Sequence, residues 1–336
     1  MKKLYAIEWL RGLAALSVCV MHFFNATDYF TASDPIFTSV LSKITILGRL
    51  GVPVFFVISG FIIPFSMYNG GYVFPQKLKN FLARRFTRIE PPYILSIVFC
   101  LATWYVIRVH VEGGTFTIDW KNILMHLGYL NAIDGKGWIL GVYWTLGVEF
   151  QYYLVISLLF PLLFIKSFNI RLATILILLA VSFGLSKLTH PGIIFRHIPL
   201  FMAGIITFKL KEGLMPIAWF WGIILLVLGL IFVDMGVSYV VSTIFVVTVI
   251  YFDFDIKFKP MYFLGTISYS LYLMHWTFGV DISMRLFRYL MPDLPEMGKI
   301  LVVIACIFVS VFLSYLYYLL IEKPAIRWGK NLKAKA

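Results

Sequence analysis

Apolar segments of about twenty residues follow one another along almost the whole chain, separated by short polar stretches. A helix of about 20 apolar residues is long enough to cross a bilayer. Only helices and closed barrels satisfy their backbone hydrogen bonds in lipid. The chain is 61% hydrophobic and 13% charged, whereas soluble globular proteins have about 45–50% apolar and about 25% charged residues. These features predict an all-α, polytopic membrane bundle.

About ten segments are long and apolar enough to be predicted as transmembrane helices. They are residues 6–26, 50–68, 91–109, 143–165, 170–188, 194–210, 215–233, 236–252, 261–280 and 300–321. The first is too long for a signal peptide and is not followed by a small-residue cleavage site, so we expect the mature protein to retain it. We expect residues 1–336 to form a single membrane domain with short termini and no appended soluble domain.

An even number of spans puts both ends of the chain on one side of the membrane. Basic residues accumulate in cytoplasmic loops, and most of the 29 lysines and arginines fall inside if the amino terminus is cytoplasmic. We therefore predict that both termini are cytoplasmic. The net charge of +13 does not indicate nucleic-acid binding, because the basic residues lie beside spans, where they contact anionic lipid headgroups. Membrane lipids are the expected partners, and the sequence does not indicate an oligomeric state.

The three cysteines all lie within apolar segments, and their number is odd. They are Cys19, Cys100 and Cys306. Neither a disulfide framework nor a metal site is indicated. We expect these cysteines to be packing residues.

Arg11 and His22 lie eleven positions apart within the first apolar segment. At about 100° and 1.5 Å per residue, they share one helix face about 16 Å apart along the axis. A charged or titratable side chain in hydrocarbon costs at least about 2.5 kcal/mol unless it faces a polar interior. The pair therefore predicts a functional site, with a purely structural pair as the alternative.

Two further titratable residues fall at a depth similar to that of His22 in the predicted topology. Glu149 lies near the outer end of a span that runs from outside to inside, and His275 lies near the outer end of a span that runs from inside to outside. A membrane carboxylate needs a cation or hydrogen-bond donor as partner, and His22 would suit Glu149. His275 has a structural alternative as a hydrogen-bonded core histidine.

A basic segment precedes the third predicted span, which we expect to begin at Pro91. Arg84, Arg85 and Arg88 have spacings that can share one helical face, and guanidinium groups suit phosphate. They are interpreted either as anchors to lipid headgroups or as a site for a phosphate-rich cytosolic donor.

Together these motifs resemble the membrane-bound acyltransferase-3 family, which O-acylates sugars of bacterial surface polysaccharides and some small glycosides. The resemblance covers nearly the whole chain and is carried by Glu8-Trp-Leu-Arg11 with His22, Gly51 to Phe61, Arg84 to Tyr93, Trp144 to Glu149, Arg196 to Gly204, Ser268 to His275, and Ile321 to Pro324. Glu8 stands where aspartate is commoner, and we expect no extracellular esterase-like domain after the last span. The resemblance implies a ten-helix core in the bacterial cytoplasmic (inner) membrane, a cytosolic acyl-CoA donor, a carbohydrate or glycolipid acceptor, and essential residues matching Arg11 and His22.

The expected chemistry is acyl transfer, typically of acetyl from acetyl-CoA, to a sugar hydroxyl. Such a hydroxyl is a poor nucleophile, so the reaction needs a base with a pKa near the working pH, and histidine is the usual candidate. His22 would be the base and Glu149 would orient it, while Arg11 would hold the donor or stabilise negative charge. Arg84, Arg85 and Arg88 would bind the CoA phosphates.

Several other residues have possible supporting roles in this scheme, namely Glu8, Ser59, Trp144, Tyr269 and His275. Ser59 has an alternative role as an acylated nucleophile, but a Ser-Gly pair in an apolar helix is typical of close packing. Tyr152, Tyr153, Tyr269 and Tyr272 could stack on sugar rings, although tyrosines in such a bundle more often serve packing.

A different class of function stays open. Buried arginine, glutamate and histidine also occur in proton-coupled transporters and in flippases of glycans or small molecules. Transporters often show two related halves with broken helices in corresponding places. The sequence shows no such repeat, which favours the acyltransferase.

Overall fold

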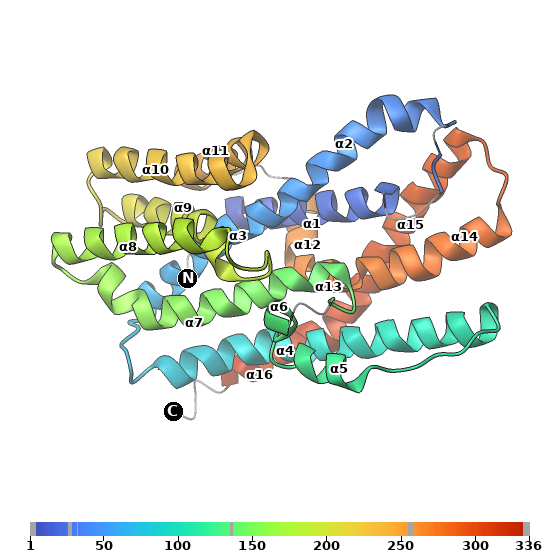
Figure 1. The fold of residues 1–336 in the computed structure, drawn as a ribbon, viewed down its shortest axis with the longest axis horizontal. Helices are drawn as coiled ribbons and strands as arrows, with labels where there is room; N and C mark the ends of the chain where they lie inside the picture. The colour runs from blue at the N-terminus through green and yellow to red at the C-terminus, as the bar shows by residue number, and fades with distance from the viewer. Residues whose placement is uncertain (1–4, 26–28, 32, 135–136, 255–257, 332–336) are drawn as a thin grey trace. The chain divides into compact units, whose positions relative to one another are not determined.

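The computed structural model describes residues 5–25, 29–31, 33–134, 137–254 and 258–331 (Figure 1). Within these ranges the regular structure is helical, without strands. The α-helices are α1 (Tyr5–Asn25), α2 (Ser42–Ile46), α3 (Gly51–Asn69), α4 (Leu78–Tyr105), α5 (Trp120–His126), α6 (Asn131–Asp134), α7 (Trp144–Phe164), α8 (Phe168–Ser186), α9 (Ile198–Lys211), α10 (Ile217–Met235), α11 (Val237–Phe252), α12 (Lys259–Thr266), α13 (Ser268–Met274), α14 (Arg285–Leu290), α15 (Glu296–Tyr317) and α16 (Lys323–Asn331). The predicted all-α fold class is confirmed.

Seven helical segments in the described ranges are long and apolar enough to cross a membrane. They are Tyr5–Asn25, Leu47–Asn69, Leu78–Val111, Gly141–Phe164, Phe168–Ser186, Ile217–Met235 and Glu296–Asn331. Each overlaps one of the predicted spans. The chain is therefore a polytopic helical membrane protein.

The other three predicted spans are helical but shorter or interrupted. Helix α9 has 14 residues and α11 has 16. Residues 261–280 fall into α12, α13 and the start of a π-helical segment, His275–Met284. The predicted total of ten spans therefore stays a prediction.

One predicted boundary is wrong. The helix of the third predicted span does not begin at Pro91, because α4 starts at Leu78 and contains both Pro91 and Pro92. Proline removes a backbone donor from a helix, and neighbouring helices can satisfy the carbonyl groups that lose a partner. The carbonyl groups that lose their helical N–H donor are those of Thr87 and Arg88. The Tyr269 hydroxyl donates to the nearby carbonyl of Ile89 at 2.9 Å, and the Tyr317 hydroxyl donates to that of Pro92, so α13 and α15 are bonded to α4 beside the two prolines.

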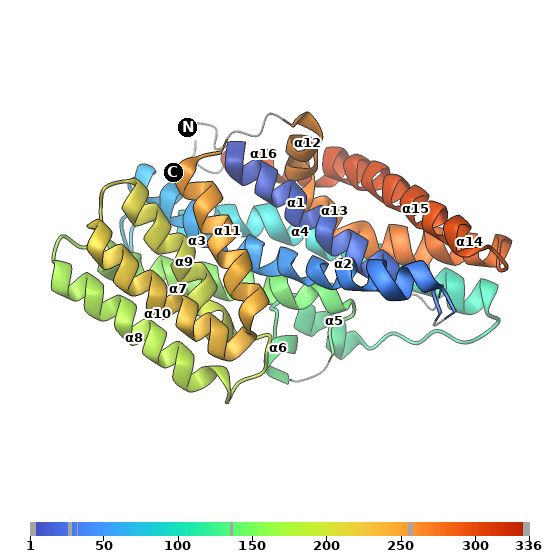
Figure 2. The ribbon, with the colours of Figure 1, turned by 90° about the horizontal axis from the view of Figure 1, so that it is seen from above.

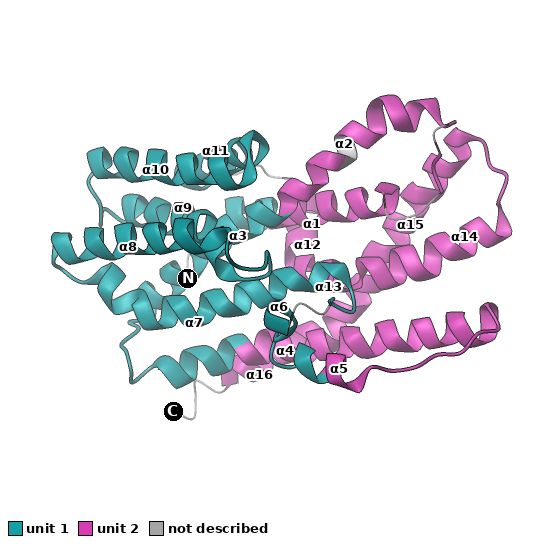
Figure 3. Ribbon diagram, viewed as in Figure 1, with its two compact units in different colours: residues 1–10, 52–85, 124–257 teal, residues 11–51, 86–123, 258–336 magenta. Residues whose placement is uncertain are grey.

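The chain divides into two compact units, each made of several chain segments (Figure 3). Unit 1 comprises residues 1–10, 52–85 and 124–257, and unit 2 comprises residues 11–51, 86–123 and 258–336. Four of the boundaries fall within helices α1, α3, α4 and α5, and the fifth falls between α11 and α12.

Helix α9 lies at the centre of unit 1, where it packs against α8, α10 and α11 (Figures 1 and 2). Every residue from Ile198 to Lys209 is buried. Helix α3 approaches α9 closely, since a Cβ atom at Gly60 would lie only 2.1 Å from the Phe201 carbonyl oxygen. The Ser59-Gly60 pair is thus a close-packing site, as its sequence suggested.

Helix α15 is the main packing element of unit 2, in contact with α13 and with the π-helical segment His275–Met284. The loop before α2 is tied to the first turn of α15. Lys299 donates to both carboxylate oxygens of Asp34 at 3.0 and 2.9 Å. The Glu296 carboxylate accepts hydrogen bonds from the backbone N–H groups of Ile36 and Phe37.

The three cysteines are free and buried. This agrees with their expected role as packing residues.

Candidate functional site

His22 and His275 meet in unit 2 although they are 253 positions apart in the chain. His22 Nδ1 lies 2.9 Å from His275 Nε2, and the two rings are nearly parallel, with an interplanar angle of 13°. His275 Nδ1 lies 2.8 Å from the Tyr272 carbonyl oxygen and 3.1 Å from that of Leu271. Two residues predicted for the site are therefore in direct contact.

Close packing beside the pair holds His22 in place. Its neighbour Phe23 is fully buried and fills the space that a side chain at position 279 would need, since a Cβ atom there would lie 1.8 Å from the phenyl ring. The edge of the Trp276 ring contacts His22 on another side, with centroids 5.2 Å apart. His275 is fully buried, whereas His22 is only partly buried. Of the two imidazole rings, that of His22 is therefore the more accessible.

Asp281 holds Trp276 from the π-helical segment. Its carboxylate accepts hydrogen bonds from the indole N–H of Trp104, at 3.0 Å, and from the Trp276 side chain. Trp276 therefore connects the two residues, since its side chain donates to Asp281 and its ring contacts His22. The sequence analysis did not single out Asp281, although a buried aspartate in an apolar helix is itself a signal of a polar site.

A second polar cluster in unit 2 surrounds Glu322. This carboxylate is 1% exposed and accepts hydrogen bonds from the backbone N–H of Ser270, at 3.2 Å, and from its hydroxyl, at 2.5 Å. The charges of Arg88 and Arg11 both act on it. Arg11 and Arg88 are thus near enough to this buried carboxylate for their charges to act on it. Glu322 has no predicted role, although it stands in the Ile321 to Pro324 motif.

Glu149 lies in unit 1, on α7, where it has two hydrogen-bond donors. The Tyr153 hydroxyl donates to Glu149 Oε1 at 2.5 Å, and Ser59 Oγ donates to the same atom at 3.4 Å. The predicted pairing of Glu149 with His22 stays a prediction. Trp144, one turn earlier on α7, packs against His197 and Phe56, with ring centroids 5.3 and 6.2 Å away.

The three arginines of α4 have different neighbours. Arg84 donates to the carbonyl of Asn80 at 3.0 Å. Arg85 lies over the rings of Phe81 and Tyr153, 5.4 and 5.5 Å from their centroids. All three guanidinium-bearing side chains are partly exposed. A shared phosphate site at Arg84, Arg85 and Arg88 stays a prediction.

Two other predicted residues have places consistent with supporting roles. Glu8 lies in the first turn of α1, where a carboxylate is favoured by the helix dipole. The Tyr269 hydroxyl serves the backbone of α4, as described above. The tyrosines Tyr152 and Tyr153 are both buried, the first stacked on Phe201 with centroids 4.0 Å apart.

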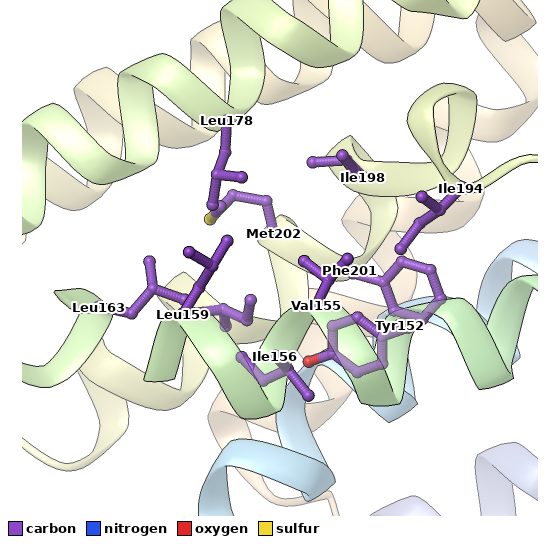
Figure 4. A pocket seen from close by; sticks show the side chains of 11 residues that line it. Tyr152, Val155, Ile156, Leu159, Leu163, Leu178, Ile194, Ile198, Phe201 and Met202 are labelled. Atoms are coloured by element: carbon purple, nitrogen blue, oxygen red, sulfur yellow. The ribbon is translucent and has the colours of Figure 1, made fainter. Parts of the chain in front are cut away.

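A small cavity in unit 1 lies between α7, α8 and α9 (Figure 4). Its volume is about 20 Å³, and its lining is apolar apart from Tyr152. A space of this size holds no more than about one water molecule. It is therefore a packing gap, too small for an acyl chain or a sugar.

Comparison with known proteins places this arrangement in a family. The model of the acyltransferase-3 family, described as an acyltransferase domain, matches residues 4–319. The sequence is 28% identical to the acyltransferase MdmB of Streptomyces mycarofaciens over 170 residues, which are 48% of this chain and 40% of that protein. It is 30% identical to an uncharacterized protein of Haemophilus influenzae over 145 residues, which are 39% of this chain and 59% of that protein.

The matched segments thus span less than two thirds of the length of each of these curated relatives. No solved structure matches the chain at a significant level. The family match, by contrast, covers nearly the whole chain and includes every motif on which the resemblance rested except Ile321 to Pro324, which lies just beyond it. The chain belongs to the acyltransferase-3 family.

Proposed function

We propose that the protein transfers an acyl group, typically acetyl, from cytosolic acyl-CoA to a hydroxyl of a cell-surface or lipid-linked sugar. The family match supports acyl transfer. The observation that carries the assignment of the base is the partly exposed His22 imidazole, held by a hydrogen bond to the buried His275. The proposed setting is the bacterial inner membrane, with both termini in the cytoplasm.

The proposed reaction is a direct transfer with one proton passing through His22. The imidazole takes the proton of the acceptor hydroxyl as its oxygen attacks the thioester carbonyl carbon. The C–O bond forms, the C–S bond breaks, and the proton passes from His22 to the sulfur of the leaving CoA. The products are an O-acyl sugar and free CoA thiol, so no further reactant is needed.

Several charged residues are proposed to assist the reaction. Arg11 would stabilise negative charge on the donor or at the developing oxyanion, and Glu322 would position its guanidinium group. Glu149, whose carboxylate accepts hydrogen bonds from Tyr153 and Ser59, would orient the His22 imidazole. Arg84 and Arg85, together with Arg88, would bind the phosphates of CoA.

The test is an acetyl-transfer assay on the full chain purified into lipid nanodiscs. The protein is incubated with radiolabelled acetyl-CoA and a panel of glycans and glycolipids, and label in the acceptor is measured against release of CoA thiol. We expect label in at least one acceptor, and we expect His22→Ala to reduce the rate by about 10²–10⁴-fold, the usual contribution of a general base.

His110→Ala is the matched control, because His110 is an exposed histidine outside both polar clusters. Near-native turnover by His22→Ala would rule out His22 as the base. Movement of an unmodified glycan across proteoliposome membranes, without acetyl transfer by the same preparation, would indicate a transporter or flippase.

A further inference from the structure

The hydrogen bonds of His275 define which of its nitrogens carries the proton. Its Nδ1 faces two backbone carbonyl oxygens, of Tyr272 at 2.8 Å and of Leu271 at 3.1 Å. A carbonyl oxygen can only accept, so Nδ1 must carry the hydrogen. A neutral imidazole has one N–H group. A second proton would give this fully buried ring a positive charge, and these hydrogen-bond partners include no carboxylate to balance it. The Nε2 atom of His275 therefore offers a lone pair.

This lone pair defines the state of His22 in turn. Because His275 Nε2 can only accept, His22 Nδ1 at 2.9 Å must donate. The rings are almost parallel, and their centroids are 5.1 Å apart, well beyond the N···N distance. Both nitrogen atoms thus lie near the line that joins the two ring centroids. This line is close to the direction of the lone pair on His275 Nε2. In neutral His22, the free lone pair then lies on Nε2.

We infer that His275 is a positioning residue, which fixes His22 as the Nδ1–H tautomer and so presents Nε2 as the basic atom. A free imidazole in water favours the opposite tautomer, with the hydrogen on Nε2, and His22 would then have no lone pair to offer at that atom. When Nε2 takes a proton, the Nδ1–H···Nε2 hydrogen bond gains a charged donor and becomes stronger. The catalytic meaning of this arrangement rests on the proposed function, whereas the tautomer does not.

The surrounding contacts support a role that is indirect. His275 is fully buried, so substrate can reach it only through His22. Phe23 against Gly279 and the Trp276 edge against His22 restrict rotation of the His22 ring. A ring held in this way keeps its Nδ1 on His275 and its Nε2 directed elsewhere.

Three substitutions of His275 distinguish the effect of its hydrogen bond to His22 from the effect of its side-chain volume. In His275→Gln, the amide oxygen can lie near the former Nε2 position and accept from His22. In His275→Asn, the shorter amide can reach the carbonyl groups near the former Nδ1 but not His22. In His275→Phe, the ring volume is kept and both polar atoms are removed. His110→Phe is the matched control, because it changes an exposed histidine.

The primary measurement is ¹⁵N NMR of the full chain, labelled at histidine, in lipid nanodiscs without any acyl donor. The His22 signals are identified by their loss in His22→Ala, and their shifts distinguish the Nδ1–H from the Nε2–H tautomer. We expect the Nδ1–H tautomer in the native protein, in His275→Gln and in His110→Phe. We expect a shift toward the Nε2–H tautomer in His275→Asn and His275→Phe.

The second measurement is the kinetics of acyl transfer. In His275→Asn and His275→Phe, kcat should fall by about 10²–10⁴-fold, the range for loss of general-base catalysis, while the KM values for donor and acceptor stay nearly unchanged. His275→Gln should restore most of kcat. A structural role alone would reduce the amount of folded protein in all three variants but would leave the tautomer unchanged.

An Nε2–H tautomer in native His22 would overturn the inference, as would a native tautomer and native kcat in both His275→Asn and His275→Phe. If His275→Phe does not fold, His275→Asn carries the same test. Because the NMR measurement needs no acyl donor, it stays decisive even if the acetyl-transfer assay finds no product. Failure of the proposed function and failure of this inference are thus observed separately.

Discussion

At the scale of single residues, Arg84 and Arg85 are the best probes of the donor site. Both are partly exposed, and neither belongs to the buried cluster around Glu322. If they bind the CoA phosphates, changing each to glutamine should raise the KM for acyl-CoA about 10-fold or more, since each charge-assisted hydrogen bond contributes about 1.5–3 kcal/mol. The KM for the acceptor and kcat should change little, because binding lost equally in ground and transition states affects KM alone.

Lys166→Gln is the control for this pair, because it removes an exposed cation that the predicted topology also places inside. Initial rates are measured over a range of donor concentrations at low and physiological salt. Added salt should inhibit the native protein more than the double variant, since exposed phosphate contacts are screened. An unchanged donor KM would leave the two arginines as headgroup anchors.

The residues of the site could be predicted from sequence only in part. His22 and His275 stood out because titratable side chains in apolar segments are costly and therefore conspicuous. Their contact could not be predicted, because spacing along one helix gives a face and a depth but not the neighbouring helix. Glu322 was missed for the same reason, since its partners Ser270, Arg88 and Arg11 come from three other segments.

At the scale of elements, the Asp34 carboxylate fastens a loop to the start of α15. The backbone N–H of Thr31 and the ammonium group of Lys299 hold the pKa of Asp34 below its ordinary value of 3.8. A carboxyl with a lowered pKa in the folded state stabilises the protein above its unfolded pKa, and this contribution is lost as the pH falls through the folded value. The tie should therefore be intact at neutral pH and released only in acid.

We expect Asp34→Asn to lower the thermal unfolding midpoint of the purified protein at pH 7. The difference from the native protein should stay constant down to about pH 5 and shrink below about pH 4, since the native carboxyl then becomes neutral as well. Asp293→Asn is the control, because Asp293 is exposed in the loop just before α15. If the unfolding midpoint of Asp34→Asn is lower than that of the native protein by the same amount at pH 3, packing of the side chain rather than its charge stabilises this contact.

The elements that were predicted well are those with long, uninterrupted apolar sequence, such as α1 and α10. The exceptions have physical reasons. Helix α4 continues through Pro91 and Pro92, where tyrosine hydroxyls from α13 and α15 donate to the carbonyl groups of Ile89 and Pro92. Such tertiary contacts cannot be seen in a local window of sequence. Residues 261–280 have the composition of one span, yet the helix is interrupted at Ile267.

At the scale of the whole molecule, the orientation in the membrane and the number of crossings can be measured together. Single cysteines are introduced at exposed positions and treated with a membrane-impermeant thiol reagent in intact cells. The native cysteines are buried, so they add little background. Asn69→Cys should be protected and Gly114→Cys and Pro292→Cys labelled, because the predicted topology places the latter two outside.

The same method tests whether α9 crosses the membrane despite its 14 residues. Leu188→Cys and Glu212→Cys lie in exposed positions on either side of α9. The ten-span prediction requires labelling at position 188 and protection at 212. Equal labelling at both positions would show that α9 does not cross and that the count is lower. Labelling of Asn69→Cys alone would reverse the predicted orientation.

The packing of Phe23 on Gly279 has a consequence for how sequence variation in this protein should be interpreted. Position 279 touches no substrate in the proposed reaction, yet any side chain larger than hydrogen there must displace the neighbour of His22. A random-mutagenesis screen would therefore score glycine 279 as though it were a catalytic residue. Positions that do not tolerate substitution in such a screen would include residues that hold the His22 ring in place as well as residues that take part in the reaction. The two kinds of residue can be distinguished only when protein abundance and the tautomer of His22 are measured together with activity.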